Sequence, residues 1–293
     1  MYFLNLFKES QKKDKNMPEL PEVETVNLAL SKLIKNTKVI EVEILRKDLR
    51  WKIKNTLKKN LKNDILIESY RRGKYILIPT LRDNILLIHL GMSGQIKIRD
   101  KKEILLKHDH VRITIESVDK NFYYIIYNDP RRFGYIDLFN KNEIRQHFLL
   151  KNLGVDPFSK KFNKEYLSEI FKNRSKNIKN SLIDQNIIAG IGNIYASEIL
   201  FKAKINPYKN VNALMDEDLK SIIRATRSIL KKSITLGGTT IKNHTQPDGK
   251  LGYFKQKLQV YGKKNKKCSI CNKILVMSYI SKRSTFYCKQ CQI

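Results

Sequence analysis

The four cysteines of the chain form two close pairs near its C-terminus. Cys268 and Cys271 lie in the segment CSIC, Cys288 and Cys291 lie in CKQC, and sixteen residues separate the pairs. Two C-x2-C pairs are typical of four thiolates that surround one zinc ion. A secreted protein would distribute disulfides through its core instead. The spacing therefore predicts a metal site, with a pair of disulfides as the alternative.

This predicted site is closed. Four protein ligands leave no open position for water or substrate, so one Zn2+ ion would stabilise the fold and take no part in chemistry. Lys282 and Arg283 lie between the two cysteine pairs. They could present cations to a phosphate, or they could belong to an ordinary solvated hairpin, because exposed Lys and Arg are common.

A glycine-rich segment, AGIGN at 189–193, lies between two apolar stretches with helical spacing. Glycines permit a sharp turn and a close approach between backbones. Asn193 could cap the second helix or donate to a phosphate beside its N-terminus. Ordinary capping is the better interpretation of these residues alone. A dinucleotide-binding fold is not indicated, because the glycines follow a helical pattern and not a strand.

The charge balance favours a polyanionic partner. The chain has 293 residues, with 58 Lys and Arg against 28 Asp and Glu, which gives a net charge of +30. Such a charge is typical of nucleic-acid binding. A codon bias toward Lys, Asn and Ile is the alternative explanation, and binding to a membrane surface is a weaker one. No stretch approaches the roughly 20 apolar residues that span a bilayer, and we expect a soluble protein of the bacterial cytosol.

The hydrophobic pattern predicts an α+β fold in several parts. Helical spacing is seen at 28–36, with Thr25 as a possible cap. Alternation then predicts a series of short strands that form an antiparallel sandwich or barrel. These predicted strands are 38–45, 64–68, 75–79, 84–90, 95–99, 111–115 and 122–127.

The second half of the chain is predicted to be helical, after a turn-rich linker at 152–157. Its expected helices are 164–171, 177–186, 193–201 and 216–233. Gly237, Gly238, Gly249 and Gly252 mark a long loop that follows. The expected organisation is an extension at 1–16, a catalytic β-sandwich domain at 17–150, a helical domain with this loop at 151–265 and a zinc finger at 266–293.

Seven sequence motifs occur in an order that is highly specific. They are MPELPEVET at 17–25, HLGMSG at 89–94, KHDH at 107–110, NDPRRFG at 128–134, GIGNIYASE at 190–198, GGTT at 237–240 and QVYG at 259–262. From Met17 onward the chain closely resembles the formamidopyrimidine-DNA glycosylase family. The sister family that removes oxidised pyrimidines usually differs after the leading Pro-Glu, so PELPEVE favours the purine branch.

The resemblance implies a DNA-repair enzyme with a helix-two-turn-helix domain, a glycosylase and AP lyase of base excision repair. It would act on damaged double-stranded DNA as a monomer, with the DNA in a basic cleft between the domains. Members of the family use an N-terminal proline, which Pro18 matches, to form a Schiff base at the damaged nucleotide and nick the strand by β,δ-elimination. Their substrates are oxidised purines, namely 8-oxoguanine and formamidopyrimidines.

The same resemblance assigns roles to further residues. Glu19 matches the family's general acid and base, Lys74 assists elimination and contacts phosphate, and Arg283 is associated with the second elimination. Without the resemblance, Glu19 and Glu22 would be interpreted as a charged first helical turn. The positions that match phosphate contacts are His108, Arg131, Arg174 and Asn193.

Three residues match the family's trio that fills the space left by a flipped nucleotide. Met92 and Phe133 are apolar wedges, and Arg131 would reach the orphaned base. Extrusion is required because the enzyme acts on a base inside a duplex. Ordinary core packing is the alternative for Met92 and Phe133. The segment from Gly237 to Phe254 corresponds to a loop that closes over the flipped base.

The sixteen residues before Met17 depart from the family pattern. If they are retained, the nitrogen of Pro18 is an amide and cannot act as a nucleophile. We favour a true start at Met17, with 1–16 as a mis-assigned start; otherwise activity is lost or requires processing. A non-catalytic damage-binding protein is then the second hypothesis. A basic zinc protein that binds structured RNA is the third, and the wedge residues argue against it.

Overall fold

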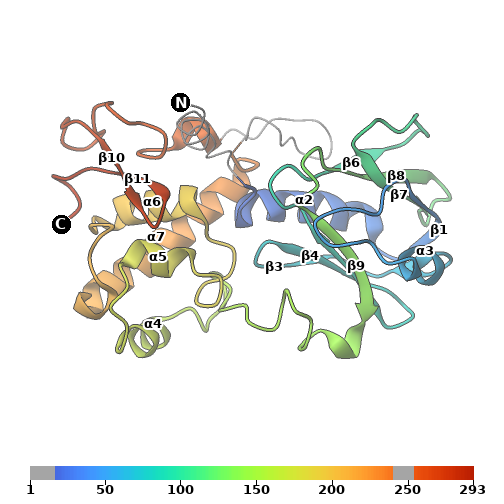
Figure 1. Ribbon diagram of the computed structural model, residues 1–293, viewed down its shortest axis with the longest axis horizontal. Helices are drawn as coiled ribbons and strands as arrows, with labels where there is room; N and C mark the ends of the chain where they lie inside the picture. Colours follow the sequence, from blue (N-terminus) through green and yellow to red (C-terminus); the bar gives the residue numbers. More distant parts are fainter. Residues whose placement is uncertain (1–16, 240–253) are drawn as a thin grey trace, which may run out of the picture.

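The computed structural model describes residues 17–239 and 254–293, in two halves along one long axis. Figure 1 shows the strands β1 to β9 at one end and the helices α4 to α7 with the hairpin β10–β11 at the other. Helix α2 (Leu20–Ile34) runs from the middle of the molecule into the β half. Among these residues, no helix is long and apolar enough to cross a membrane.

Two antiparallel sheets build the β half. One has the order β2-β1-β7-β8-β6 and the other the order β3-β4-β5-β9. The first consists of β1 (Thr37–Ile44), β2 (Ile65–Leu66), β6 (Gln95–Arg99), β7 (Asp109–Glu116) and β8 (Phe122–Asn128). The second consists of β3 (Tyr70–Arg72), β4 (Tyr75–Pro79), β5 (Asn84–His89) and β9 (Tyr135–Asn140).

The core of this half lies between the two sheets and includes α2. Val42 of β1, Ile78 of β4 and Leu86 of β5 belong to one buried apolar cluster, together with Val26 and Leu30 of α2. Alternate residues on β4 and β5 are buried on the other face of the second sheet. The α+β prediction with an antiparallel sandwich is thereby confirmed, and the barrel alternative is wrong, because the strands form two separate sheets.

Helix α2 begins eight residues earlier than predicted. Glu19 is its N-cap, and Glu22 completes a capping box with the Glu19 backbone. The proposed cap Thr25 lies inside the helix, where its hydroxyl donates to the Pro21 carbonyl over 2.9 Å. Apolar spacing alone predicts that the helix starts at residue 28, whereas the capping box places its start at Leu20. The interpretation of Glu19 and Glu22 as a charged first turn is confirmed.

Three elements of the β half were not predicted. Helix α3 (Thr56–Leu61) is a short connection after β1. Strand β3 carries Arg71, whose side chain is buried in ion pairs with Glu24 and Asp156. Strand β9 carries Asp137, which is 3% exposed and pairs with Lys54 and His147. Charged residues at these buried positions break the apolar alternation on which the prediction depended.

The second half contains the predicted helices with small changes in their ends. They are α4 (Lys164–Phe171), α5 (Ile178–Ile183), α6 (Asn193–Ala203) and α7 (Asp216–Thr235). Their apolar faces form a second core that includes Tyr195 and Leu230. The predicted helix 177–186 is shorter, since its C-cap Asp184 has an extended backbone. Short 3-10 helices η2 (Lys141–Glu143), η3 (Val211–Ala213) and η4 (Phe254–Lys257) complete the described structure.

The C-terminal hairpin pairs β10 (Val276–Ile280) with β11 (Arg283–Tyr287). Ile280 pairs with Arg283, so only Ser281 and Lys282 form the turn, at φ values of +48° and +62°. Positive φ at both central residues is typical of a type I′ hairpin turn. Lys282 and Arg283 are exposed at this end of the hairpin.

Candidate active site

The N-terminus of α2 joins the two halves of the molecule. Leu20 belongs to the helical core although the rest of the helix packs in the β core. Its backbone N–H donates to the Gly190 carbonyl over 3.0 Å. Pro18 and Glu19 are buried at this junction. The fold therefore places the start of MPELPEVET directly against the glycine-rich segment 189–193.

The Glu19 carboxylate lies on the N-terminus of α6. It accepts the backbone N–H groups of Gly192 at 2.6 Å, Ile194 at 2.9 Å and Tyr195 at 3.4 Å. The positive end of the helix dipole favours an anion at this position. Gly192 has to be glycine, because a Cβ there would overlap the Glu19 carboxyl group.

At neutral pH the Glu19 carboxyl group is nevertheless close to the midpoint of its titration. Burial raises the pKa of its carboxyl group to about 7, and the neighbouring Glu22 adds to the rise. Lys74 and the N–H groups of Ile194 and Gly192 act in the opposite direction. A carboxyl group with a pKa near neutrality can both donate and accept a proton at neutral pH.

Glu22 anchors the base of the loop that follows α7. Its Oε1 atom accepts the N–H and the hydroxyl of Thr239 at 2.8 and 2.7 Å and the Tyr195 hydroxyl at 2.7 Å. Its Oε2 atom accepts the Glu19 N–H at 2.9 Å. The contacts connect α2, α6 and Thr239. The predicted loop itself falls on 240–253, outside the described residues.

Lys74 approaches this junction from the turn between β3 and β4. Gly73, with φ of +58°, permits the turn. Burial lowers the pKa of the Lys74 ammonium group, and the positive charge of Arg283 lowers it further. Glu19 and Glu22 raise it. Lys74 therefore lies within electrostatic range of Glu19, Glu22 and Arg283, which come from distant parts of the chain.

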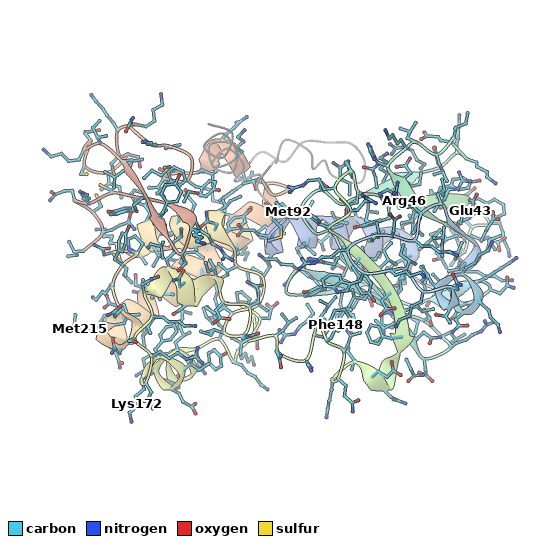
Figure 2. All side chains as sticks on the ribbon, viewed as in Figure 1. Glu43, Arg46, Met92, Phe148, Lys172 and Met215 are labelled. Atoms are coloured by element: carbon cyan, nitrogen blue, oxygen red, sulfur yellow. The ribbon has the colours of Figure 1, made fainter. Side chains whose placement is uncertain are left out.

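The predicted wedge residues line one cavity of about 690 Å3. Met17, Met92, Arg131 and Phe133 all contribute to its wall, and so does His89. The Arg131 guanidinium carbon lies 4.8 Å from the centre of the Phe133 ring, a cation–π contact. Figure 2 places Met92 near the middle of the long axis, between the two halves. Phe133 is 40% exposed, so simple core packing does not describe it.

The remaining predicted phosphate contacts are more dispersed. His108 is half-buried before β7, and Arg174 is exposed between α4 and α5. Asn193 is the first residue of α6, whose N-cap is Gly192, so the suggestion that Asn193 caps the helix is wrong. Its amide donates to the Ser284 carbonyl over 2.9 Å, which connects α6 with β11. Its Oδ1 atom is buried and has no partner among the described residues.

The four cysteine sulfurs lie within 4.8 Å of one another. The Sγ atoms of Cys268 and Cys291 are 3.8 Å apart, and those of Cys271 and Cys288 are 3.5 Å apart. Sulfurs at about 2.3 Å from a tetrahedral zinc ion would be separated by roughly 3.8 Å. The predicted cluster can therefore hold a metal ion, and its donor set and spacing fit zinc.

Several buried polar residues in and around the site were missed from the sequence. Lys179 is 1% exposed and donates to the Ser284 carbonyl and the Thr285 hydroxyl, both at 2.7 Å. Glu198 is 3% exposed and accepts three backbone N–H groups at 259–261. Burial lowers the pKa of His89 to about 4. Charged residues within apolar helical stretches are a signal for such buried contacts, but their partners are distant in the chain.

Comparison with known proteins covers most of the chain. Residues 17–136 match the model of the formamidopyrimidine-DNA glycosylase N-terminal domain, and residues 153–245 match that of the family's H2TH domain. The chain is 41% identical over 276 residues to formamidopyrimidine-DNA glycosylase of Rickettsia massiliae, covering 94% of this chain and 97% of that protein. It is 42% identical over 276 residues to the enzyme of the same name from Vesicomyosocius okutanii, covering 94% of this chain and 100% of the relative.

Solved structures of the same family superpose on the chain. A point mutant of Lactococcus lactis FPG, crystallised with Fapy-dG-containing DNA, superposes with a TM-score of 0.85 at 33% identity. The match covers 94% of this chain and 99% of that one. The complex of Lactococcus lactis Fpg with DNA that contains an abasic site has a TM-score of 0.84 at 33% identity, with the same coverage.

Proposed function

We propose that this protein excises oxidised purines from double-stranded DNA and then nicks the strand. The premise is that the chain belongs to the formamidopyrimidine-DNA glycosylase family, which the matched domains and the relatives show. The substrates would be 8-oxoguanine and formamidopyrimidines. The observation that carries this proposal is the junction where Pro18, Glu19 and Lys74 meet the N-terminus of α6. This junction would combine a nucleophile at Pro18 with the Glu19 carboxyl group, whose pKa is near 7, and the buried Lys74 ammonium group.

The reaction begins at the nitrogen of Pro18, once that nitrogen is a free secondary amine. It bonds to C1′ of the damaged nucleotide while the base departs with the electrons of the glycosidic bond. The proton that the Pro18 nitrogen carries goes to the departing base. Glu19 donates a proton to the sugar oxygen as the C1′–O4′ bond breaks, and the nitrogen lone pair forms the C1′=N bond of an iminium ion. This ion cannot lose its charge by deprotonation at nitrogen, so it acts as an electron sink.

The iminium ion makes strand scission possible. Loss of a proton from C2′ expels the 3′ phosphate, and loss of a second proton from C4′ expels the 5′ phosphate. Lys74, whose ammonium pKa is lowered by burial, would assist these transfers. Arg283, near Lys74, would act in the second elimination and on phosphate. His108, Arg174 and Asn193 would hold the DNA backbone in the basic cleft between the halves.

We further propose that Cys268, Cys271, Cys288 and Cys291 hold one zinc ion. The ion would have only protein ligands, so it would supply stability and no chemistry. Its effect would be to keep the β10–β11 hairpin folded, and therefore to keep Arg283 in place.

We also propose the domain limits 17–150, 151–265 and 266–293 and a location in the bacterial cytosol.

The decisive experiment is borohydride trapping on duplex DNA that contains 8-oxoguanine. Protein that begins at Pro18, checked by intact mass, is compared with the full 293-residue chain. We expect only the first to cross-link, because a Pro18 amide has no nucleophilic nitrogen. If neither form cross-links, the proposed chemistry is wrong. If damaged DNA is still bound selectively, a non-catalytic damage-binding protein becomes the better hypothesis.

Substituting Gly192 by alanine should disable base excision by displacing Glu19. The φ of Gly192 is −132°, which alanine adopts without strain, so the defect is a steric overlap with the carboxyl group. Because a displacement of about 1 Å can cost about 100-fold in rate, we expect single-turnover excision to fall by that order. Gly262→Ala is the control for a general loss of stability: its Cβ would meet nothing within 4 Å, but its φ of +73° strains an alanine, so it should destabilise the protein and keep excision. Wild-type excision by Gly192→Ala would contradict the role of Glu19.

Replacing Cys288 by serine should remove the metal and weaken DNA binding. A structural zinc site supplies much of the folding free energy of a small module, so losing one ligand should unfold the hairpin. We expect zinc content, measured by elemental analysis, to fall close to zero, and duplex affinity to fall by at least about tenfold. Ser269→Ala changes a residue between Cys268 and Cys271 without removing a ligand and should retain both. Normal binding by a zinc-free Cys288→Ser protein would refute the structural role.

A further inference from the structure

Two loops of the β half touch closely on the side that lines the 690 Å3 cavity. The first, 90–94, carries Met92, and the second, 129–134, carries Arg131 and Phe133. Gly91 has a φ of +59°, and a Cβ there would overlap the backbone of Phe133 and Gly134. The two loops therefore meet backbone to backbone, without side chains between them.

Asp129 is the polar centre of this contact. Its side chain is fully buried, at 0% exposure. Oδ1 accepts the Ser93 hydroxyl at 2.5 Å, and Oδ2 accepts the Gly134 N–H at 2.8 Å. Oδ1 also accepts the Arg131 N–H at 3.3 Å, and Oδ2 the Tyr127 hydroxyl at 3.4 Å. Both carboxylate oxygens are therefore used by donors from the two loops and from β8.

Ser93 closes the bridge from the other loop. Its hydroxyl donates to Asp129 and accepts the Arg131 N–H at 3.0 Å, so one oxygen atom joins both segments. Ser93 is only 3% exposed, and water cannot easily replace these bonds. The backbone of Asp129 is bonded as well. Its carbonyl oxygen lies 2.8 Å from His110 Nε2, and its N–H donates to the His108 carbonyl over 3.0 Å.

We propose that Asp129 and Ser93 are positioning residues that join the two loops into one rigid unit, so that Met92, Arg131 and Phe133 enter the duplex together. The inference rests on the proposed function, because it concerns how the wedge is held. Both residues are buried, at 0% and 3% exposure, so they would act through the loops that they join. Groups that act in concert need a supporting shell, and a loop misplaced by about 1 Å can lose about 100-fold in rate.

The test separates wedge entry from chemistry. Duplex DNA carries a tetrahydrofuran residue, which has no base to excise, opposite 2-aminopurine, whose fluorescence reports its stacking. Stopped-flow mixing with protein that begins at Pro18 measures how fast the wedge enters, and titration of the same DNA measures affinity. We expect entry to slow by about 5- to 10-fold in Ser93→Ala, which loses buried hydrogen bonds. In Asp129→Asn we expect about 100-fold, because an amide cannot accept all four donors.

Affinity for the duplex should change by less than about threefold in both variants, since phosphate contacts dominate it. Asp64→Asn is the matched control for folding. Asp64 is also a buried carboxylate that accepts backbone N–H groups, from Ile65 at 2.8 Å and Arg82 at 3.2 Å, and it lies away from both loops. Its entry rate should equal that of the wild type.

The outcomes distinguish this inference from the proposed function. Unchanged entry rates in Ser93→Ala, together with a wild-type fluorescence signal, would overturn the inference alone. A wild-type protein that is trapped by borohydride but gives no fluorescence change would also overturn it. Failure of borohydride trapping overturns the proposed chemistry, whereas slower entry in both variants would still support the rigid unit. The double variant should be no slower than Asp129→Asn, because the two residues act through the same bonds.

Discussion

Replacing Pro18 by glycine, in protein that begins at residue 18, should reduce strand scission at 8-oxoguanine by at least about 100-fold. A glycine amine can still form an imine, but it is primary, so the imine can lose its proton and with it the fixed charge that drives elimination. Glycine also lacks the ring that restrains the nitrogen beside Glu19. Both losses act on the reacting atom and not on the DNA contacts.

Duplex binding should stay within about tenfold of the wild type, because phosphate contacts supply most of the affinity. The measurement combines single-turnover scission, borohydride trapping and a binding titration at one salt concentration. The full 293-residue chain is the matched control, since it has the proline but no free amine there. Wild-type scission by a Pro18→Gly protein that borohydride does not trap would rule out the imine mechanism, whereas loss of binding would mean that Pro18 is structural.

The sequence was most informative where chemistry and local geometry coincide. Cys268 and Cys271 are close in any fold because two residues separate them, and the same holds for Cys288 and Cys291. Helix α4 was predicted with its observed ends, since Asn163 is a side-chain cap and the apolar spacing is regular. In both cases the signal lies within a few residues of the element that it predicts.

The buried contacts that the sequence did not predict depend on partners outside the local segment. Asp137 is buried in β9 because Lys54, 83 residues away in the chain, pairs with its charge, and His147 lies within hydrogen-bond distance of it. Lys179 is buried because β11 supplies its acceptors. Likewise, no local pattern shows that Glu19 would sit on the N-terminus of α6. The family resemblance named Glu19 as an acid, but the reason for its raised pKa is visible only in the tertiary structure.

Substituting Glu19 by glutamine should remove the alkaline limb of base excision together with most of the activity. Burial raises the pKa of Glu19 to about 7, so its acid form is abundant below that pH and is lost above it. If the acid form protonates the sugar, wild-type excision should fall about tenfold per pH unit once the Pro18 amine is also neutral, above about pH 8. The acidic limb comes from the Pro18 amine, which has to be neutral; an ordinary α-amino group has a pKa of about 7.7–8.0.

Glutamine cannot donate this proton, and its amide NH2 would face the N–H group of either Gly192 or Ile194, which bond different oxygens of Glu19. We expect single-turnover excision of 8-oxoguanine to fall by about 100- to 10,000-fold, the usual contribution of a general acid. Scission at a preformed abasic site should fall much less, because the base has already left, and its pH profile should keep only the acidic limb of the Pro18 amine. The measurement is the pair of pH–rate profiles from about pH 5 to pH 9.

Glu198→Gln is a matched control for burial. Glu198 is also 3% exposed, accepts three backbone N–H groups, and has a pKa that burial raises, but its partners lie at 259–261 and away from Lys74. This variant should lose stability and keep the alkaline limb. If Glu198→Gln loses the limb as well, the limb reports the fold and not the acid. If Glu19→Gln keeps it, the proton comes from another group, and Lys74 becomes the first candidate because its ammonium pKa is lowered.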